Sequence, residues 1–192
     1  AKAAPFMEAS GTEVTRSIIR PNSKFESSYR EYIQELQDEE RYPFPLDFDY
    51  SDFPSLLNRL AEIEAGRELP AGHGPSCSFW LVESGEILGV SNLRHFLNDE
   101  IRRCGGHIGL GIRPSQRGRG LGGELMSLTI QEARKRGFGE VHIHCYESNV
   151  ASGKIIDANG GVLHSLVEDS GSANVVQRFV VPAPNNGLKS DA

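Results

Sequence analysis

The sequence predicts a single α/β (α+β) domain over residues 1–182, in which antiparallel N-terminal strands cross to a parallel pair and helices cover both faces of a mixed sheet. A chain of 192 residues is long enough to bury one substantial core. Short apolar runs with tight links fill residues 78–112, as in an antiparallel meander. A long helical pattern then separates two strand patterns, and such a crossover normally joins parallel strands.

The first third of the chain is predicted to be mainly helical. One strand is expected within residues 14–19. Apolar residues at three- and four-residue spacing predict a helix over residues 25–40, which Pro43 would end. A second helix is expected over residues 52–65, with Gly66 at its C-terminal end.

Three successive strands with short links follow. The apolar run at residues 78–83 is joined by Ser84-Gly85, a two-residue hairpin signal, to a partner strand over residues 86–96. Residues 98–105 are expected to form a turn, and residues 107–112 the third strand. The remaining elements are expected in this order: a helix over 120–136, a strand over 141–146, a short helix over 149–159, a hairpin of strands 162–167 and 175–181, and a disordered tail over 183–192.

Composition excludes several classes of function. A net charge of −6 argues against a general nucleic-acid binder. No apolar run reaches the roughly 20 residues of a membrane span, and the first residues do not resemble a signal peptide, so a cytoplasmic protein is expected. Three widely spaced cysteines form neither a metal-binding box nor a disulfide framework. His142 and His144 share one face of a strand without a third ligand, so no metal ion is expected.

The stretch from Gly111 to Gly123 carries the strongest chemical signal. It leads from an apolar strand, through a basic turn with Arg117 and Arg119, into the start of the best predicted helix. Four glycines crowd its end: Gly118, Gly120, Gly122 and Gly123. Glycine lets backbone N–H groups approach an anion, and a helix start adds unpaired donors and a positive dipole end. The stretch therefore predicts a phosphate-binding site.

A dinucleotide site is the first alternative, because Gly118, Gly120 and Gly123 satisfy the pattern G-x-G-x-x-G. That pattern should follow its strand almost directly, within a first βαβ unit. Here residues 113–117, which include a proline, intervene, and antiparallel strands come before. A Walker-type loop is excluded because no Gly-Lys-Ser/Thr occurs.

A different family uses all of these residues. Arg117, Gly120 and Gly122 match the motif Arg/Gln-x-x-Gly-x-Gly/Ala, the segment 149–152 matches Asn-x-x-Ala/Ser, and the segment 159–161 matches a helix ending in Asn-Gly-Gly. Over about residues 78–181 the chain thus resembles the GNAT family of N-acetyltransferases. Within that family, residues 94–95, 106–109 and 149–161 look most like a bacterial branch of predicted acetyltransferases.

The resemblance implies an N-acetyltransferase that moves an acetyl group from acetyl-CoA to a primary amine, by direct transfer in a ternary complex. The acceptor would be a small molecule or a peptide, with no nucleic-acid or membrane partner; a homodimer is left open. The pantetheine arm would pair with the strand ending at Ile112, and the glycine-rich turn would bind the pyrophosphate. The cofactor-binding residues are then expected to be Leu110, Gly111, Ile112, Arg113, Arg117, Gly118, Arg119, Gly120, Leu121, Gly122, Gly123, Asn149 and Ser152.

Catalysis requires a base for the amine and an acid for the leaving thiolate. His107 opens the strand beside the acetyl group and is predicted to be the base, with Glu83 and His95 as alternatives. Many family members carry the acid as a tyrosine seven residues after the motif asparagine, where this chain has Ile156. Tyr146 is a nearby tyrosine. The missing acid motivates a second hypothesis, a catalytically weak acyl-CoA-binding or sensor protein.

Acidic residues gather in the predicted helices and loops before residue 53. They would favour a cationic acceptor, and a solvated acidic surface explains them equally well. These residues are Glu39, Glu40, Asp47, Asp49 and Asp52.

Overall fold

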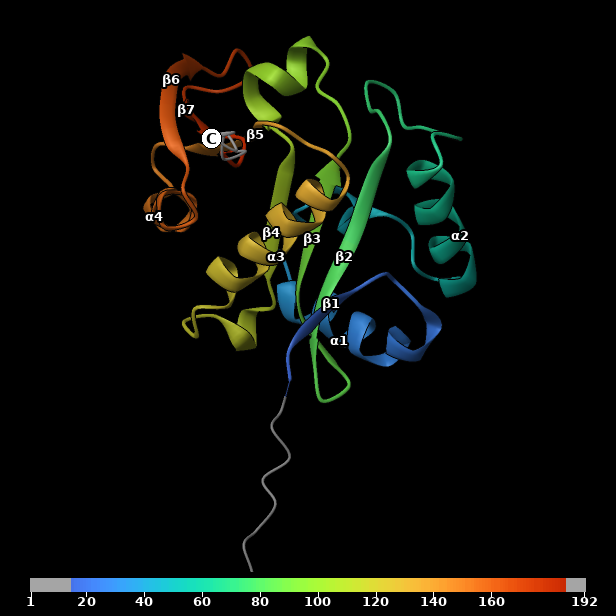
Figure 1. Ribbon diagram of the computed structural model, residues 1–192. Coiled ribbons are helices and arrows are strands. Elements are labelled where there is room, and N and C mark those ends of the chain that lie inside the picture. Colours follow the sequence, from blue (N-terminus) through green and yellow to red (C-terminus); the bar gives the residue numbers. More distant parts are fainter. Residues whose placement is uncertain (1–14, 186–192) are drawn as a thin grey trace, which may run out of the picture.

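The computed structural model describes residues 15–185 (Figure 1). Its helices are α1 (Glu26–Leu36), α2 (Phe53–Glu64), α3 (Leu121–Lys135) and α4 (Val150–Ala158). Its strands are β1 (Ser17–Ile19), β2 (Ser76–Glu83), β3 (Glu86–Arg94), β4 (Ile108–Ile112), β5 (Val141–Tyr146), β6 (Val162–Glu168) and β7 (Val175–Val181). Short helical turns occur at Ser23–Phe25, Phe44–Asp47, Ile101–Gly105 and Pro114–Gln116. The start of the strand expected at 14–19 and most of the tail expected at 183–192 lie outside the described residues.

The first four strands form one antiparallel sheet in the order β1-β2-β3-β4. The predicted meander of three strands is confirmed as β2-β3-β4, and β1 adds to it beside β2. Ser84 and Gly85 both have positive φ angles and close the β2–β3 hairpin. Alternate residues of β2 face opposite layers: Trp80 packs in a core with α1 and α2, whereas Leu81 packs against Leu125 of α3. Helices therefore cover both faces of this sheet, and the period of two in the sequence is what builds the two cores.

The predicted parallel pair is wrong. The last three strands form a separate antiparallel sheet in the order β5-β7-β6, and no parallel ladder occurs among residues 15–185. Strands β4 and β5 meet at an isolated antiparallel bridge between Gly106 and Ile143, where the His107 N–H donates to the His142 carbonyl at 2.6 Å. One edge of β4 is paired with β3, and one edge of β5 is paired with β7. The other edges of β4 and β5 face each other, and no ladder of hydrogen bonds joins them.

Helix α1 ends four residues before its predicted end. Gln37 has a φ of 47°, a left-handed conformation that stops the helix. The chain then turns back, and Tyr42 reaches β4 where Gly109 and Gly111 leave room for it. No helix among residues 15–185 is long and apolar enough to cross a membrane.

Candidate active site

The facing edges of β4 and β5 enclose a narrow gap. A cavity of about 40 Å³ lies in it, with walls that include Gly109 and Leu110 of β4, His144 of β5 and Ser152 of α4. A second cavity of about 260 Å³ shares Tyr42, His144 and Ser152 with the first. Because alternate N–H and C=O groups of β4 point away from β3, an extended ligand in this gap can pair with the strand as an additional strand would.

The glycine-rich turn lies between the end of β4 and the start of α3. Gly118 and Gly120 have φ angles of 79° and 75°, and no atom lies within 4 Å of the position that a Cβ would take at either. The first backbone bond of α3 is donated by Glu124 to Gly120, so the preceding N–H groups of the helix have no intrahelical acceptor. An open turn with unpaired donors at a helix start fits a phosphate group.

The three arginines near the turn differ in what they contact. Arg113 is buried and its guanidinium donates to Glu35 at 2.7 Å and to Glu31 at 3.3 Å, so its side-chain donors serve the fold rather than the predicted cofactor site. Arg117 is half exposed and holds both carboxylate oxygens of Glu39. Arg119 is also half exposed.

Arg119 reaches Glu83 at 3.4 Å and also contacts Gln116. Arg117 and Arg119 are both exposed, so each can bind a phosphate if its surface ion pair breaks. Such ion pairs are weak, and breaking them requires little free energy.

Several predicted cofactor residues have packing roles. Leu121 is buried, and Leu110 and Ile112 pack against the cores on the α3 side of the sheet. A Cβ on Gly122 would meet Ile155 of α4 at 2.8 Å, so this glycine permits close packing of α3 on α4. Gly123 is open, with nothing within 4 Å of a Cβ position.

The start of α4 brings two predicted residues to the larger cavity. Asn149 is the N-cap of α4, and its side-chain oxygen accepts from the Ser152 N–H at 3.1 Å. Both residues line the larger cavity, and Ser152 lines the smaller one as well. The Asn-x-x-Ser spacing therefore caps a helix at the edge of the gap.

His107 lies at the closed end of the gap. Its ring Nδ1 accepts from the His142 N–H at 2.9 Å, and the ring packs edge-on against Phe138. Burial, and then the nearby His142 and arginines, lower the pKa of His107 to about 4. The neutral ring joins β4 to β5, and a catalytic role for His107 stays a prediction.

This arrangement makes stability depend on pH. The folded pKa of His107 is below its unfolded value of about 6.5, so the unfolded chain binds more protons and stability falls as pH drops from 6.5 towards 4. His107→Asn removes this titration and keeps an acceptor for the His142 N–H. When the pH falls from 7 to 5, we expect the free energy of unfolding of His107→Asn to fall by about 1–2 kcal/mol less than that of the wild type. Urea unfolding at the two pH values measures this. Equal losses in both proteins would show that His107 does not titrate in this way.

The other predicted catalytic residues are scattered. Glu83 binds Arg16 at 2.9 Å, and His95 contacts the Cys77 sulfur at 3.0 Å; neither lines the two cavities. Tyr146 lines the larger cavity, and its hydroxyl donates to Asp169 at 3.1 Å.

His144 lines both cavities without being in the predicted set. It is buried, and burial lowers its pKa to about 3, with the charges of neighbouring histidines and Arg178 adding to the effect.

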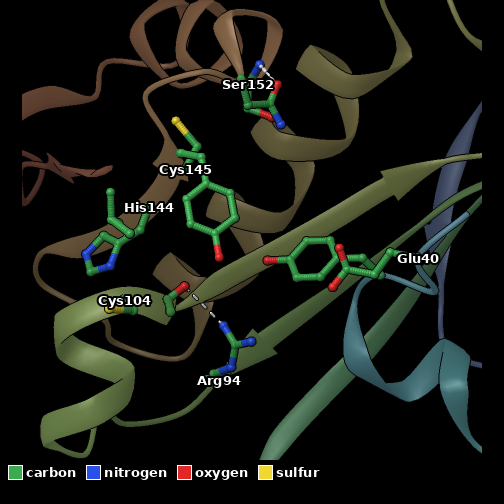
Figure 2. A pocket seen from close by; sticks show the side chains of 11 residues that line it. Glu40, Arg94, Cys104, His144, Cys145 and Ser152 are labelled. Carbon is green, nitrogen blue, oxygen red and sulfur yellow. Dashed lines mark hydrogen bonds between the residues drawn. The ribbon is translucent and has the colours of Figure 1, made fainter. Parts of the chain in front are cut away.

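Two further residues of the larger cavity, Arg94 and Tyr42, are not among the site residues predicted from the sequence. Figure 2 shows Arg94 reaching towards the cavity, with Glu40 on one side and His144 and Cys145 on the other. Arg94 donates to the Gly106 carbonyl at 2.9 Å. Tyr42 lines both cavities. The one signal for Tyr42 is the pair of alternate glycines in β4, which indicates that something packs closely on that face.

The acidic residues divide into two groups: Glu39, Glu40 and Asp47 line one open surface cavity of about 580 Å³ beside Tyr42, whereas Asp49 and Asp52 do not line it. Glu39 is held by Arg117, Asp49 accepts from the Ser51 N–H, and the Asp52 carboxylate accepts from the Ser55 hydroxyl. Glu40 lines the larger cavity. One of these acidic side chains is therefore placed to meet an acceptor there.

A sequence profile described as "Acetyltransferase (GNAT) family" matches residues 29–156 of the chain. This match runs from α1 to α4 and includes the gap and the glycine-rich turn. The chain belongs to the GNAT family of acetyltransferases. No curated protein matches it in a sequence search.

Solved structures show the same fold for this acetyltransferase. A ribosomal-protein-S5-alanine acetyltransferase from Vibrio fischeri matches with a TM-score of 0.67 at 14% identity, covering 88% of this chain and 94% of that one. A putative acetyltransferase from Salmonella typhimurium with its cofactor acetyl-CoA matches with a TM-score of 0.60 at 16% identity, covering 92% of this chain and 99% of that one. A spermidine N-acetyltransferase chimera from Vibrio cholerae and hSSAT matches with a TM-score of 0.61 at 12% identity, covering 87% of this chain and 95% of that one.

Acetyl-CoA is the acyl donor of the GNAT family, and the residues present here fit it. The turn at Gly118 and Gly120 is open and rich in unpaired N–H groups, as a pyrophosphate requires. The gap beside β4 has the extended form that a pantetheine arm requires. Ile156, at the position where many relatives have a tyrosine, is buried and lines the gap without a proton to give.

Proposed function

We propose that this acetyltransferase transfers the acetyl group of acetyl-CoA to a primary amine by direct attack of the amine within a ternary complex. The observation that carries the proposal is the gap between β4 and β5, which shares walls with a larger cavity. A donor in the gap and an acceptor in the larger cavity would meet at Tyr42, His144 and Ser152.

The acyl donor would be held mainly by backbone. The N–H groups at the start of α3 would bind the pyrophosphate, with Arg117 and Arg119 leaving their surface partners to add charge. The free edge of β4 would pair with the pantetheine amides. A backbone N–H in the segment 110–112 would then polarise the thioester carbonyl.

The acceptor cavity supports an amine substrate. Glu40 lines it and offers a negative charge to an incoming ammonium group (Figure 2). The structures of similar fold include a spermidine N-acetyltransferase chimera and a ribosomal-protein-S5-alanine acetyltransferase, so both small amines and amines of peptides are candidate acceptors.

One cysteine of the larger cavity, Cys145, favours direct transfer over an acetyl-cysteine intermediate. Burial raises the pKa of the Cys145 thiol, which keeps it protonated and poorly nucleophilic. We expect mass spectrometry of the protein, after incubation with acetyl-CoA alone, to show no gain of an acetyl group. An acetylated Cys104 or Cys145 that is consumed on adding an amine would contradict direct transfer.

Thiol release from acetyl-CoA tests the function. The panel holds spermidine, free amino acids, and peptides with N-terminal alanine or serine. We expect saturable thiol release with at least one of these amines, together with acetylated product. Tight acetyl-CoA binding in calorimetry without turnover on any amine would favour an acyl-CoA sensor. Absence of acetyl-CoA binding would contradict both functions.

A further inference from the structure

Tyr42 lies across the middle of β4. A Cβ on Gly109 would be 2.5 Å from the Tyr42 hydroxyl oxygen, and a Cβ on Gly111 would be 2.5 Å from the Tyr42 carbonyl oxygen. Two glycines on the same face of the strand therefore let the residue approach the backbone. This contact places the hydroxyl beside the gap, at the boundary that both cavities share.

The hydroxyl of Tyr42 has a cationic partner. Arg94 lines the larger cavity together with Tyr42, and its positive charge acts on the hydroxyl in favour of the phenolate form. Within residues 15–185 this hydroxyl donates no hydrogen bond of its own. Tyr42 is 40% exposed as a residue, but its hydroxyl lies against Gly109. This local desolvation raises the pKa of Tyr42, and the positive charge of Arg94 opposes that rise. The phenol is thus protonated at neutral pH, and its phenolate would have a counter-charge at hand.

The neighbouring groups are less suited to give a proton. The Tyr146 hydroxyl is already donated to Asp169, whose charge raises the pKa of Tyr146. Ile156 carries no proton, and His144 is neutral because burial lowers its pKa to about 3. Tyr42 lines both cavities. Its hydroxyl proton is not donated to another of the described residues, and the positive charge of Arg94 would stabilise its phenolate.

We propose that Tyr42 is the catalytic residue that protonates the leaving thiolate, an assignment that rests on the proposed acetyl transfer. As the amine nitrogen forms its bond to the acetyl carbon, the carbon–sulfur bond breaks and the sulfur takes the proton of the Tyr42 hydroxyl. Arg94 stabilises the resulting phenolate. The amine loses one proton to water, and water in the open cavity returns one to the phenolate, so thioester and amine become thiol and amide.

Tyr42→Phe tests the assignment, because it removes the hydroxyl and keeps the ring packed on Gly109. We expect kcat to fall about 10- to 100-fold, in the range of a lost general acid, with the KM for acetyl-CoA within about twofold of the wild type. A fall in kcat for Tyr146→Phe, with full activity in Tyr42→Phe, would overturn it. So would a Tyr42→Phe variant that changes KM alone, since that effect indicates a binding role.

Ile156→Tyr in the Tyr42→Phe background gives a second measurement. Ile156 of α4 lines the same gap as Tyr42, so a tyrosine there offers a hydroxyl from a second element. We expect the double variant to regain at least a tenth of the wild-type kcat. A double variant that melts with the wild type and stays as slow as Tyr42→Phe would overturn the proton-donor role. If the wild type acetylates no amine, the proposed function fails. If the wild type acetylates an amine and Tyr42→Phe is equally active, only the assignment of Tyr42 fails, and the proposed function stands.

Discussion

We expect Gly120→Val to weaken acetyl-CoA binding at least about 30-fold, a loss of about 2 kcal/mol. Gly120 has a φ of 75° at the N-cap of α3. A residue with a Cβ pays roughly 1–2 kcal/mol to adopt this conformation, and a β-branched side chain is a still poorer fit there. The turn would relax to another conformation, and the N–H groups that face the pyrophosphate would lose their common direction.

Calorimetric titration with acetyl-CoA measures this effect, and Gly139→Val is the matched control. Gly139 has no positive φ and no atom within 4 Å of its Cβ position. The control should bind acetyl-CoA within about twofold of the wild type. Equal affinities for the wild type and Gly120→Val would show that the turn does not hold the donor.

The second large effect concerns stability. Arg113→Met should lower the free energy of unfolding by about 2–3 kcal/mol. The guanidinium is buried and donates to Glu35 and to the Ser28 hydroxyl, which ties the end of β4 to α1. Removing it leaves a partly buried carboxylate without its counter-charge, although the exposed part of Glu35 keeps some hydration.

Urea unfolding measures this loss, with Arg119→Met as the control. Arg119 is half exposed and reaches Glu83 at 3.4 Å, so its loss should cost less than about 0.5 kcal/mol. A double-mutant cycle of Arg113→Met with Glu35→Gln should give a coupling of about 1 kcal/mol or more. Similar losses for the two arginine variants would contradict a structural role for Arg113.

Local patterns were sufficient to predict most elements of the fold. Short apolar runs with tight links placed β2 to β4, the Ser84-Gly85 turn placed their first hairpin, and the helical pattern after the glycine-rich turn placed α3. The error concerned pairing: the crossover of α3 indicated a parallel neighbour, whereas β7 and β3 pair with the outer edges of β5 and β4. Which edges meet depends on contacts between residues far apart in sequence, and no local pattern records them.

The parts of the candidate site that are built from backbone groups could be predicted from the sequence. The glycine-rich turn and the cap at Asn149 are short motifs with a mechanical reason for each residue. Tyr42 and Arg113 are different, because their roles come from contacts with Gly109 and Glu35, many residues away. An isolated tyrosine or arginine in the sequence carries no sign of such a partner.

The gap between β4 and β5 is fixed on two sides by contacts already described. At one end His107 and His142 exchange two hydrogen bonds, and at the other Gly122 packs against Ile155 across α3 and α4. Neither contact involves a ligand. The gap is thus preorganised, and a donor that enters it spends little of its binding free energy on reshaping the protein. Selection for acyl chain length is then a matter of the space between two rigid walls.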